Sequence, residues 1–141
     1  MPKIDIAKAT VGTRGRYPDP WGAVTQGREK TALGDVAGLT QFGVNLTRLT
    51  PGAASALRHW HEAEDEVVYV LEGEGAVHIG DESEPLRPGS SVHLPARLVH
   101  SLENTGPDVM QVLGVFRPAG SPAEAYYPDG TPAGVPKQEE S

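Results

Sequence analysis

Short apolar runs separated by turn-forming residues recur along most of this sequence, and this pattern constrains the fold more than any other feature. Pro51-Gly52, Glu72-Gly73, Gly80-Asp81 and Pro88-Gly89 each mark a turn beside such a run. In the first run, apolar and polar residues alternate with period two, as in a half-buried strand. Turn signals about every ten residues are typical of an all-β sandwich or barrel. The candidate strands are 42–47, 67–71, 75–79, 91–94, 98–102 and 109–116.

Composition supports one globular domain and argues against two classes of partner. A length of 141 residues suits a single domain, and 38% hydrophobic with 22% charged residues is typical of globular proteins. The 17 glycines and 13 prolines fit short strands joined by tight turns. A net charge of −7 argues against nucleic acid and against an anionic membrane surface, because both require a basic patch.

Features that the sequence lacks also limit its chemistry and location. The chain has no cysteine, which excludes disulfides, thiolate nucleophiles and cysteine-ligated zinc. It has no apolar stretch of membrane-spanning length, and its first residues lack the apolar region of a secretory signal. We therefore expect a cytoplasmic protein without a membrane partner.

The turn pattern divides the chain into three segments. Residues 1–38 are polar and rich in glycine, and we expect an N-terminal arm with one or two short strands. This arm would pack across the barrel or onto a second subunit, because Trp21 and Leu33 require burial. Residues 39–118 form the predicted barrel. Residues 119–141, rich in proline, glycine and alanine, are expected to form an extended C-terminal tail.

A histidine pair and a nearby glutamate form the most informative cluster. His59 and His61 are two residues apart, so on a strand both imidazoles face the same side, with Trp60 opposite. Glu66 has the wrong parity for that face on a continuous strand, but a turn through the acidic segment 62–65 would reset the parity. Two readings are open from these residues alone: half of a metal site, or a surface pair on an edge strand.

A third histidine in the candidate strand 98–102 could complete the site. His100 would bring the set to three imidazoles and one carboxylate, which suits a divalent transition metal such as Mn, Fe, Ni or Zn. Such a set leaves coordination positions open to a substrate. We interpret His78 and His93 as structural or surface residues, because His93 alternates with apolar neighbours.

The spacing of these residues resembles the two motifs of the cupin superfamily, in particular small single-domain bacterial cupins. In the first motif, six residues separate Gly52 from His59-Trp60-His61, four more precede Glu66, and six more precede Gly73. In the second motif, five residues separate Gly89 from Pro95-Ala96-Arg97, and His100 and Asn104 follow at the expected spacing. Arg97 stands where the motif has glycine, which puts the turn before His100 in question.

The resemblance implies a fold, a site and a range of functions. The fold is all-β: a double-stranded β-helix, or jelly-roll barrel, of two antiparallel sheets. The ligands His59, His61, Glu66 and His100 would point into the barrel mouth and hold one divalent metal, and members often form homodimers. We expect a metal-dependent enzyme acting on a small oxygen-rich molecule, with dioxygenase-like or lyase-like chemistry favoured. The alternatives are a non-catalytic module that binds a small molecule or metal, and a sugar-phosphate isomerase-like enzyme.

Catalytic residues beyond the metal ligands are not identified by the sequence. Arg48 precedes the first motif and could bind a carboxylate or phosphate, although a strand-end arginine reaching solvent is the favoured reading. Arg97 could reach the mouth from its turn or face water. Tyr69 has the parity opposite to Glu66, so we expect it to pack outside the barrel.

Overall fold

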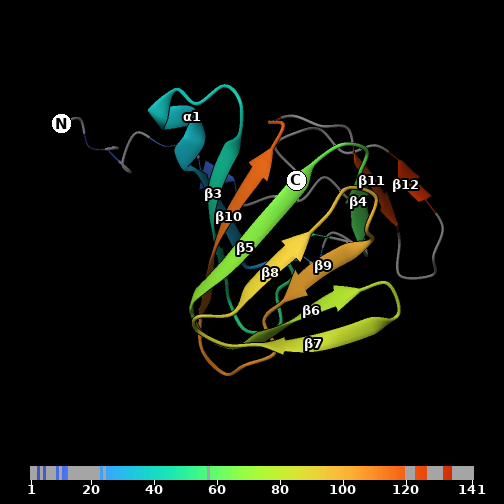
Figure 1. The fold of residues 1–141 in the computed structure, drawn as a ribbon. Helices are drawn as coiled ribbons and strands as arrows, with labels where there is room; N and C mark the ends of the chain where they lie inside the picture. The colour runs from blue at the N-terminus through green and yellow to red at the C-terminus, as the bar shows by residue number, and fades with distance from the viewer. Residues whose placement is uncertain are drawn as a thin grey trace.

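The computed structural model consists of two six-stranded sheets that form the two layers of a barrel (Figure 1). It describes residues 3, 5, 9, 11–12, 23, 25–56, 58–119, 123–126 and 132–134. All strand pairs are antiparallel, which confirms the predicted jelly-roll of two antiparallel sheets. Among these residues, none of the helices is long and apolar enough to cross a membrane.

The first sheet contains the strands that lead into and out of the predicted motifs. Its order is β1-β2-β3-β10-β5-β8. The bounds are β1 Val11–Gly12, β2 Arg28–Ala32, β3 Gly43–Leu49, β10 Met110–Arg117, β5 Asp65–Glu72 and β8 Ser91–Leu94. The short helix α1, Leu33–Ala37, packs against β3 on the outside of this sheet (Figure 1).

The second sheet contains the strands that carry the histidines of both motifs. Its order is β12-β11-β4-β9-β6-β7. The bounds are β12 Pro132–Gly134, β11 Ala123–Tyr126, β4 His59–His61, β9 His100–Glu103, β6 Gly75–Ile79 and β7 Glu82–Leu86. The sequence did not indicate β7, because its polar residues and Pro85 are poor strand formers and only Leu86 is buried. β7 pairs with β6 alone, and as an edge strand it can accommodate a proline.

Apolar side chains from both sheets meet between the layers. Each buried valine, leucine or methionine side chain stabilises the fold by about 1.5–3 kcal/mol. The cluster consists of Leu49, Ala53, Val68, Val70, Val77, Leu86, Leu94, Leu102, Met110 and Val112. Buried Val68 and Val70 alternate with exposed neighbours on β5, so this strand has one inner and one outer face.

The inner face of β3 is the polar one, contrary to what its apolar alternation suggests. Thr47 and Leu49 are buried, whereas Arg48 is exposed and Val44 and Leu46 are half-buried. Val44 and Leu46 therefore belong to the outer face, on the side where α1 packs against this strand. Arg48 shares that outer face, because residues two apart on a strand point the same way.

Asn104, the last residue of the second motif, fixes the loop that follows β9. Its side chain is 1% exposed, and its amide donates to the carbonyl oxygens of Leu49 at 2.9 Å and Asp108 at 2.8 Å. Its carbonyl oxygen accepts from the backbone N–H of Gly106 at 2.9 Å. These bonds satisfy backbone groups that the turn would otherwise leave unpaired, and they tie β9 to β3.

The turn before His100 has the backbone shape that the motif's glycine would provide. Arg97 has a φ of 68°, in the left-handed region that side chains with a Cβ rarely adopt. Its backbone N–H donates to the carbonyl oxygen of His61 at 2.8 Å, so the turn fastens β4 beside β9. The departure from the motif therefore leaves the geometry intact at a cost of about 1–2 kcal/mol.

Replacing Arg97 by glycine should stabilise the protein by about 1 kcal/mol, because glycine adopts this φ without strain. Thermal unfolding should show a midpoint about 3 °C above that of the wild type. The matched control is Arg97→Ala, which also removes the exposed 3.3 Å contact to Glu62 but keeps the strained φ. A midpoint for Arg97→Gly no higher than that of Arg97→Ala would contradict this explanation.

Candidate metal centre

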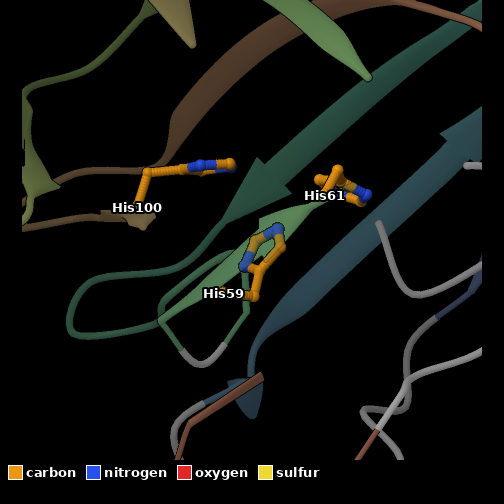
Figure 2. A group of neighbouring side chains, drawn as sticks. All are labelled: His59, His61 and His100. Carbon is orange, nitrogen blue, oxygen red and sulfur yellow. The ribbon is translucent and has the colours of Figure 1, made fainter. Parts of the chain in front are cut away.

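Three buried histidines from two neighbouring strands converge between the sheets. His59 and His61 lie on β4, and His100 lies on β9 directly opposite His59 in the register. They are 5%, 3% and 4% exposed. Figure 2 shows His100 reaching toward the two histidines of β4. One candidate ligand nitrogen from each ring lies within 4.8 Å of the others, close enough for one ion to reach all three after small side-chain shifts.

Glu66 approaches the histidines from the opposite sheet. It lies on β5, and its Oε1 is 3.9 Å from the Nε2 of His100. Glu66 follows the same parity as the buried Val68 and Val70, as predicted if the turn through 62–65 resets the strand. The structure thus brings the four predicted residues to one place, and their binding of a metal remains a prediction.

The absence of a side chain at Gly114 leaves room for the Glu66 carboxylate. A Cβ built at this position of β10 would lie 2.9 Å from the Oε2 of Glu66, closer than ordinary contact. The sequence could not single out this glycine, because it lies within an apolar run and carries no turn signal.

Hydrogen bonding and burial prepare His100 to donate a nitrogen lone pair. Its Nδ1–H donates to the carbonyl oxygen of Leu98 at 2.8 Å, which leaves the Nε2 lone pair facing Glu66. Burial lowers the pKa of His100 from 6.5 to about 4, against the opposing effect of the Leu98 hydrogen bond, and nearby His61 lowers it further. The ring therefore stays neutral, as a metal ligand must, well below neutral pH.

The pKa of the Glu66 carboxyl is shifted upward, whereas that of His100 is shifted downward. Burial raises its pKa from 4.5 to about 7, and the neighbouring Glu64 carboxylate raises it as well. Lys30 and His61 oppose that rise. A carboxyl that ionises near neutrality at a cluster of buried imidazoles is stabilised in its charged form by a bound cation.

His61 is the least satisfied member of the cluster. Neither of its ring nitrogens makes a hydrogen bond. Its Nε2 lies 2.9 Å from the Oε2 of Glu64 as a close contact without a hydrogen bond, and Oε1 of Glu64 also has no hydrogen-bond partner. Buried polar atoms without partners are uncommon in folded proteins and often mark the place of an ion or ligand.

Glu64 differs from the other acidic residues of the turn 62–65. Glu62 and Asp65 are exposed, but Glu64 is only 2% exposed and lies against His61. A second carboxylate is therefore built into the site. Only the fold distinguishes Glu64 from Glu62 and Asp65, since all three are carboxylates in the same short segment.

A cavity of about 470 Å³, counted with its open mouth, adjoins the cluster and draws its walls from both sheets. Its polar wall comes mainly from β2 and β3, and its apolar wall from β5, β8, β9 and β10. The sequence reading missed Lys30, Asn45 and Thr47 as residues of this wall, because β2 was not predicted individually and the inner face of β3 was not recognised. The lining residues are Lys30, Asn45, Thr47, Ser55, Ala56, His59, Glu66, Val68, Leu94, His100, Leu102, Val112 and Gly114.

The three other candidates from the sequence lie away from this cavity. Arg48 is exposed on the outer face of β3. Arg97 is 73% exposed at its side chain and contacts Glu62. Tyr69 is 44% exposed on the outer face of β5, as its parity predicted. None of the three belongs to the lining.

The two remaining histidines have the structural or surface roles expected of them. His78 contacts Ser83 at 2.6 Å and Glu103 at 2.8 Å on the second sheet. The side chain of His93 is 63% exposed, beside Asp65.

Substituting Gly114 by alanine should displace the Glu66 carboxylate by a few tenths of an ångström and weaken divalent-metal affinity about tenfold. The stability should change by less than about 1 kcal/mol, because the new methyl group meets only the far end of a flexible side chain. Calorimetric titration with Zn²⁺ measures the affinity. Gly12→Ala, where a Cβ meets nothing within 4 Å, is the control. Equal affinities for the two variants would contradict the role given to Gly114.

The comparisons with known proteins agree with this geometry. The family model of Cupin_2, described as a cupin domain, matches residues 45–116. A curated relative, the oxalate-binding protein of Thermotoga maritima, is 37% identical over 69 residues, which are 49% of this chain and 56% of the relative. The chain thus spans about half the length of the first curated relatives it matches.

Two solved structures extend the comparison over nearly the whole chain. A sugar phosphate isomerase from a cupin superfamily of Silicibacter pomeroyi is 32% identical with a TM-score of 0.80, covering 99% of this chain and 95% of that one. A protein of Thermotoga maritima described as a predicted oxalate decarboxylase is 25% identical, with a TM-score of 0.65. The match covers 82% of this chain and 98% of that one.

Proposed function

The chain belongs to the cupin domain family, and from that premise we propose that it is a mononuclear metal-dependent enzyme acting on a small oxygen-rich organic molecule. The proposed ligands of one divalent transition metal ion, Mn, Fe, Ni or Zn, are His59, His61, Glu66 and His100. The observation that carries the proposal is the convergence of three buried imidazoles beside a cavity, with no hydrogen bond at either nitrogen of His61.

The chemistry of the donor set supports a metal ion in this place. Three neutral imidazoles and one carboxylate form a mixed nitrogen and oxygen set that leaves coordination positions open on a five- or six-coordinate ion. Such an ion, when bound, would supply Lewis-acid chemistry by polarising a carbonyl, enolate or carboxylate oxygen. The chain's own groups would orient the molecule along the polar wall of Asn45 and Thr47 and keep water from the apolar wall.

Among reaction classes we favour a lyase or an isomerase. The two solved relatives carry names of these classes, a sugar phosphate isomerase and a predicted oxalate decarboxylase. Dioxygenase chemistry, which the sequence also suggested, would require a redox-active ion and oxygen uptake during turnover. An oxygen-electrode assay of the iron-loaded protein distinguishes it from the other two classes.

A non-catalytic binding module is the second candidate, and the relative named oxalate-binding protein favours it. The two candidates differ in turnover. Metal-loaded protein that binds oxalate or a sugar phosphate and never converts it would support the binding module, whereas product formation would support the enzyme. The homodimer and the cytoplasmic location expected from the sequence remain predictions.

Purified wild-type protein reconstituted with divalent metal should carry about one ion per chain, and His61→Ala should lose it, because one of the proposed ligands is gone. Elemental analysis after dialysis measures this ratio. His93→Ala removes an exposed histidine outside the cluster and should keep the full metal content. The proposal fails if the wild type retains no stoichiometric metal, or if the two variants lose it equally.

Metal affinity should depend on pH through Glu66. Its carboxyl, with a pKa near 7 in the metal-free chain, must lose a proton to bind a cation. Affinity should therefore fall about tenfold per pH unit below about pH 7 and level off above it. His100, with a pKa near 4, adds no dependence in that range. Zn²⁺ titrations between about pH 5.5 and 8 test this, and an equal slope in Glu66→Gln would refute the assignment to Glu66.

A further inference from the structure

We infer that Lys30 makes this cavity selective for small carboxylic acids, by binding a carboxylate of the molecule whose other oxygens face the histidine cluster. The inference deepens the proposed function by naming its substrate class. It rests on the placement of Lys30 in the cavity wall and on the chemistry of the other lining groups.

Lys30 reaches the cavity from a strand that the motifs do not include. On β2 it lies directly opposite Thr47 of β3, and both side chains line the cavity together with Glu66 and His100. Its charge is close enough to Glu66 to oppose the rise of that carboxyl's pKa. Lys30 therefore lines the same cavity as His59, Glu66 and His100, and its positive charge is near enough to act on the Glu66 carboxylate.

The supporting structure around Lys30 holds this wall in place. Arg28, two residues earlier on the same face of β2, is 2% exposed and donates from its guanidinium to the carbonyl oxygen of Ser55 at 2.7 Å. Ser55 is itself a lining residue. The strand that carries Lys30 is thus fastened to the loop that forms the neighbouring part of the wall.

The balance of groups in the cavity favours a carboxylate over a phosphate. Among the described lining residues, Lys30 is the only one with a permanently cationic side chain. A phosphate dianion is usually held by several cationic or backbone donors, whereas one ammonium with nearby Asn45 and Thr47 can satisfy a single carboxylate.

Arg48, the anion-binding candidate from the sequence, supplies a matched comparison. It lies on β3 next to Thr47 in sequence, but it is exposed on the outer face, opposite Glu29 of β2. The two cations are therefore on neighbouring strands of one sheet and on opposite faces of it. Only Lys30 faces the interior, so only its removal should affect binding in the cavity.

The test is calorimetric titration of the full-length, zinc-loaded protein with malonate, its neutral diamide malonamide and inorganic phosphate. Metal content is measured first for wild type, Lys30→Met, Lys30→Arg and Arg48→Met, and saturating zinc is kept throughout. We expect wild type to bind malonate at least tenfold more tightly than phosphate or malonamide. Lys30→Met should lose at least tenfold in malonate affinity, Lys30→Arg should recover part of it, and Arg48→Met should match wild type.

Two results would overturn the inference while leaving the metal site intact. One is equal malonate affinity in Lys30→Met and wild type at equal zinc content, and the other is tighter binding of phosphate than of malonate. If the wild type binds no metal, the proposed function fails and the inference is decided separately on the metal-free chain. Malonate binding that Lys30→Met abolishes would then support it, and no binding would overturn it.

Discussion

Burial of polar side chains between two apolar layers is the constraint on which the rest of this structure depends. His59, His61, Glu64, Glu66 and His100 all face the interior of a small barrel. A buried polar group without a partner costs about 1–3 kcal/mol, so a few of them approach the whole stability of a domain, about 5–15 kcal/mol. The hydrogen bond from His100 to the carbonyl oxygen of Leu98 compensates part of this free-energy cost. A cation would compensate the buried ring nitrogens of His61, which have no hydrogen-bond partner, and this is why the cluster is interpreted as a metal centre.

Both sheets contribute side chains to that cluster. β4 and β9 of one sheet bring the three histidines together through a single direct register pair, His59 with His100. β5 of the other sheet supplies Glu66, and Gly114 on the adjacent β10 keeps space for it. The left-handed turn at Arg97 and the buried amide of Asn104 hold the two ends of β9. The site therefore depends on turns and a glycine as much as on its polar residues.

Much of this arrangement could be predicted because it depends on local patterns. Strand parity placed Tyr69 outside the barrel, and motif spacing selected His100 rather than His78 or His93. What the sequence could not provide depends on contacts between distant segments. Glu64 is indistinguishable from its acidic neighbours until the turn buries it. Lys30 becomes part of the cavity only because β2 pairs with β3.

The orientation of β3 has a physical cause that applies to other barrels with an internal site. Apolar residues usually mark the inner face of a strand, but here the inner face borders a polar cavity and the outer face is partly covered by a helix. Asn45 and Thr47 are therefore inside, and Arg48 with Val44 is outside. A strand whose apolar alternation points away from the core is thus a signal of a polar interior site.

Anomalous diffraction from crystals of the zinc-loaded protein, recorded at the zinc absorption edge, tests the central claim most directly. We expect one strong peak between the sheets, bonded at about 2.0–2.2 Å to one nitrogen each of His59, His61 and His100 and to an oxygen of Glu66. A peak elsewhere on the molecule, or one bound by Glu64 in place of Glu66, would contradict it.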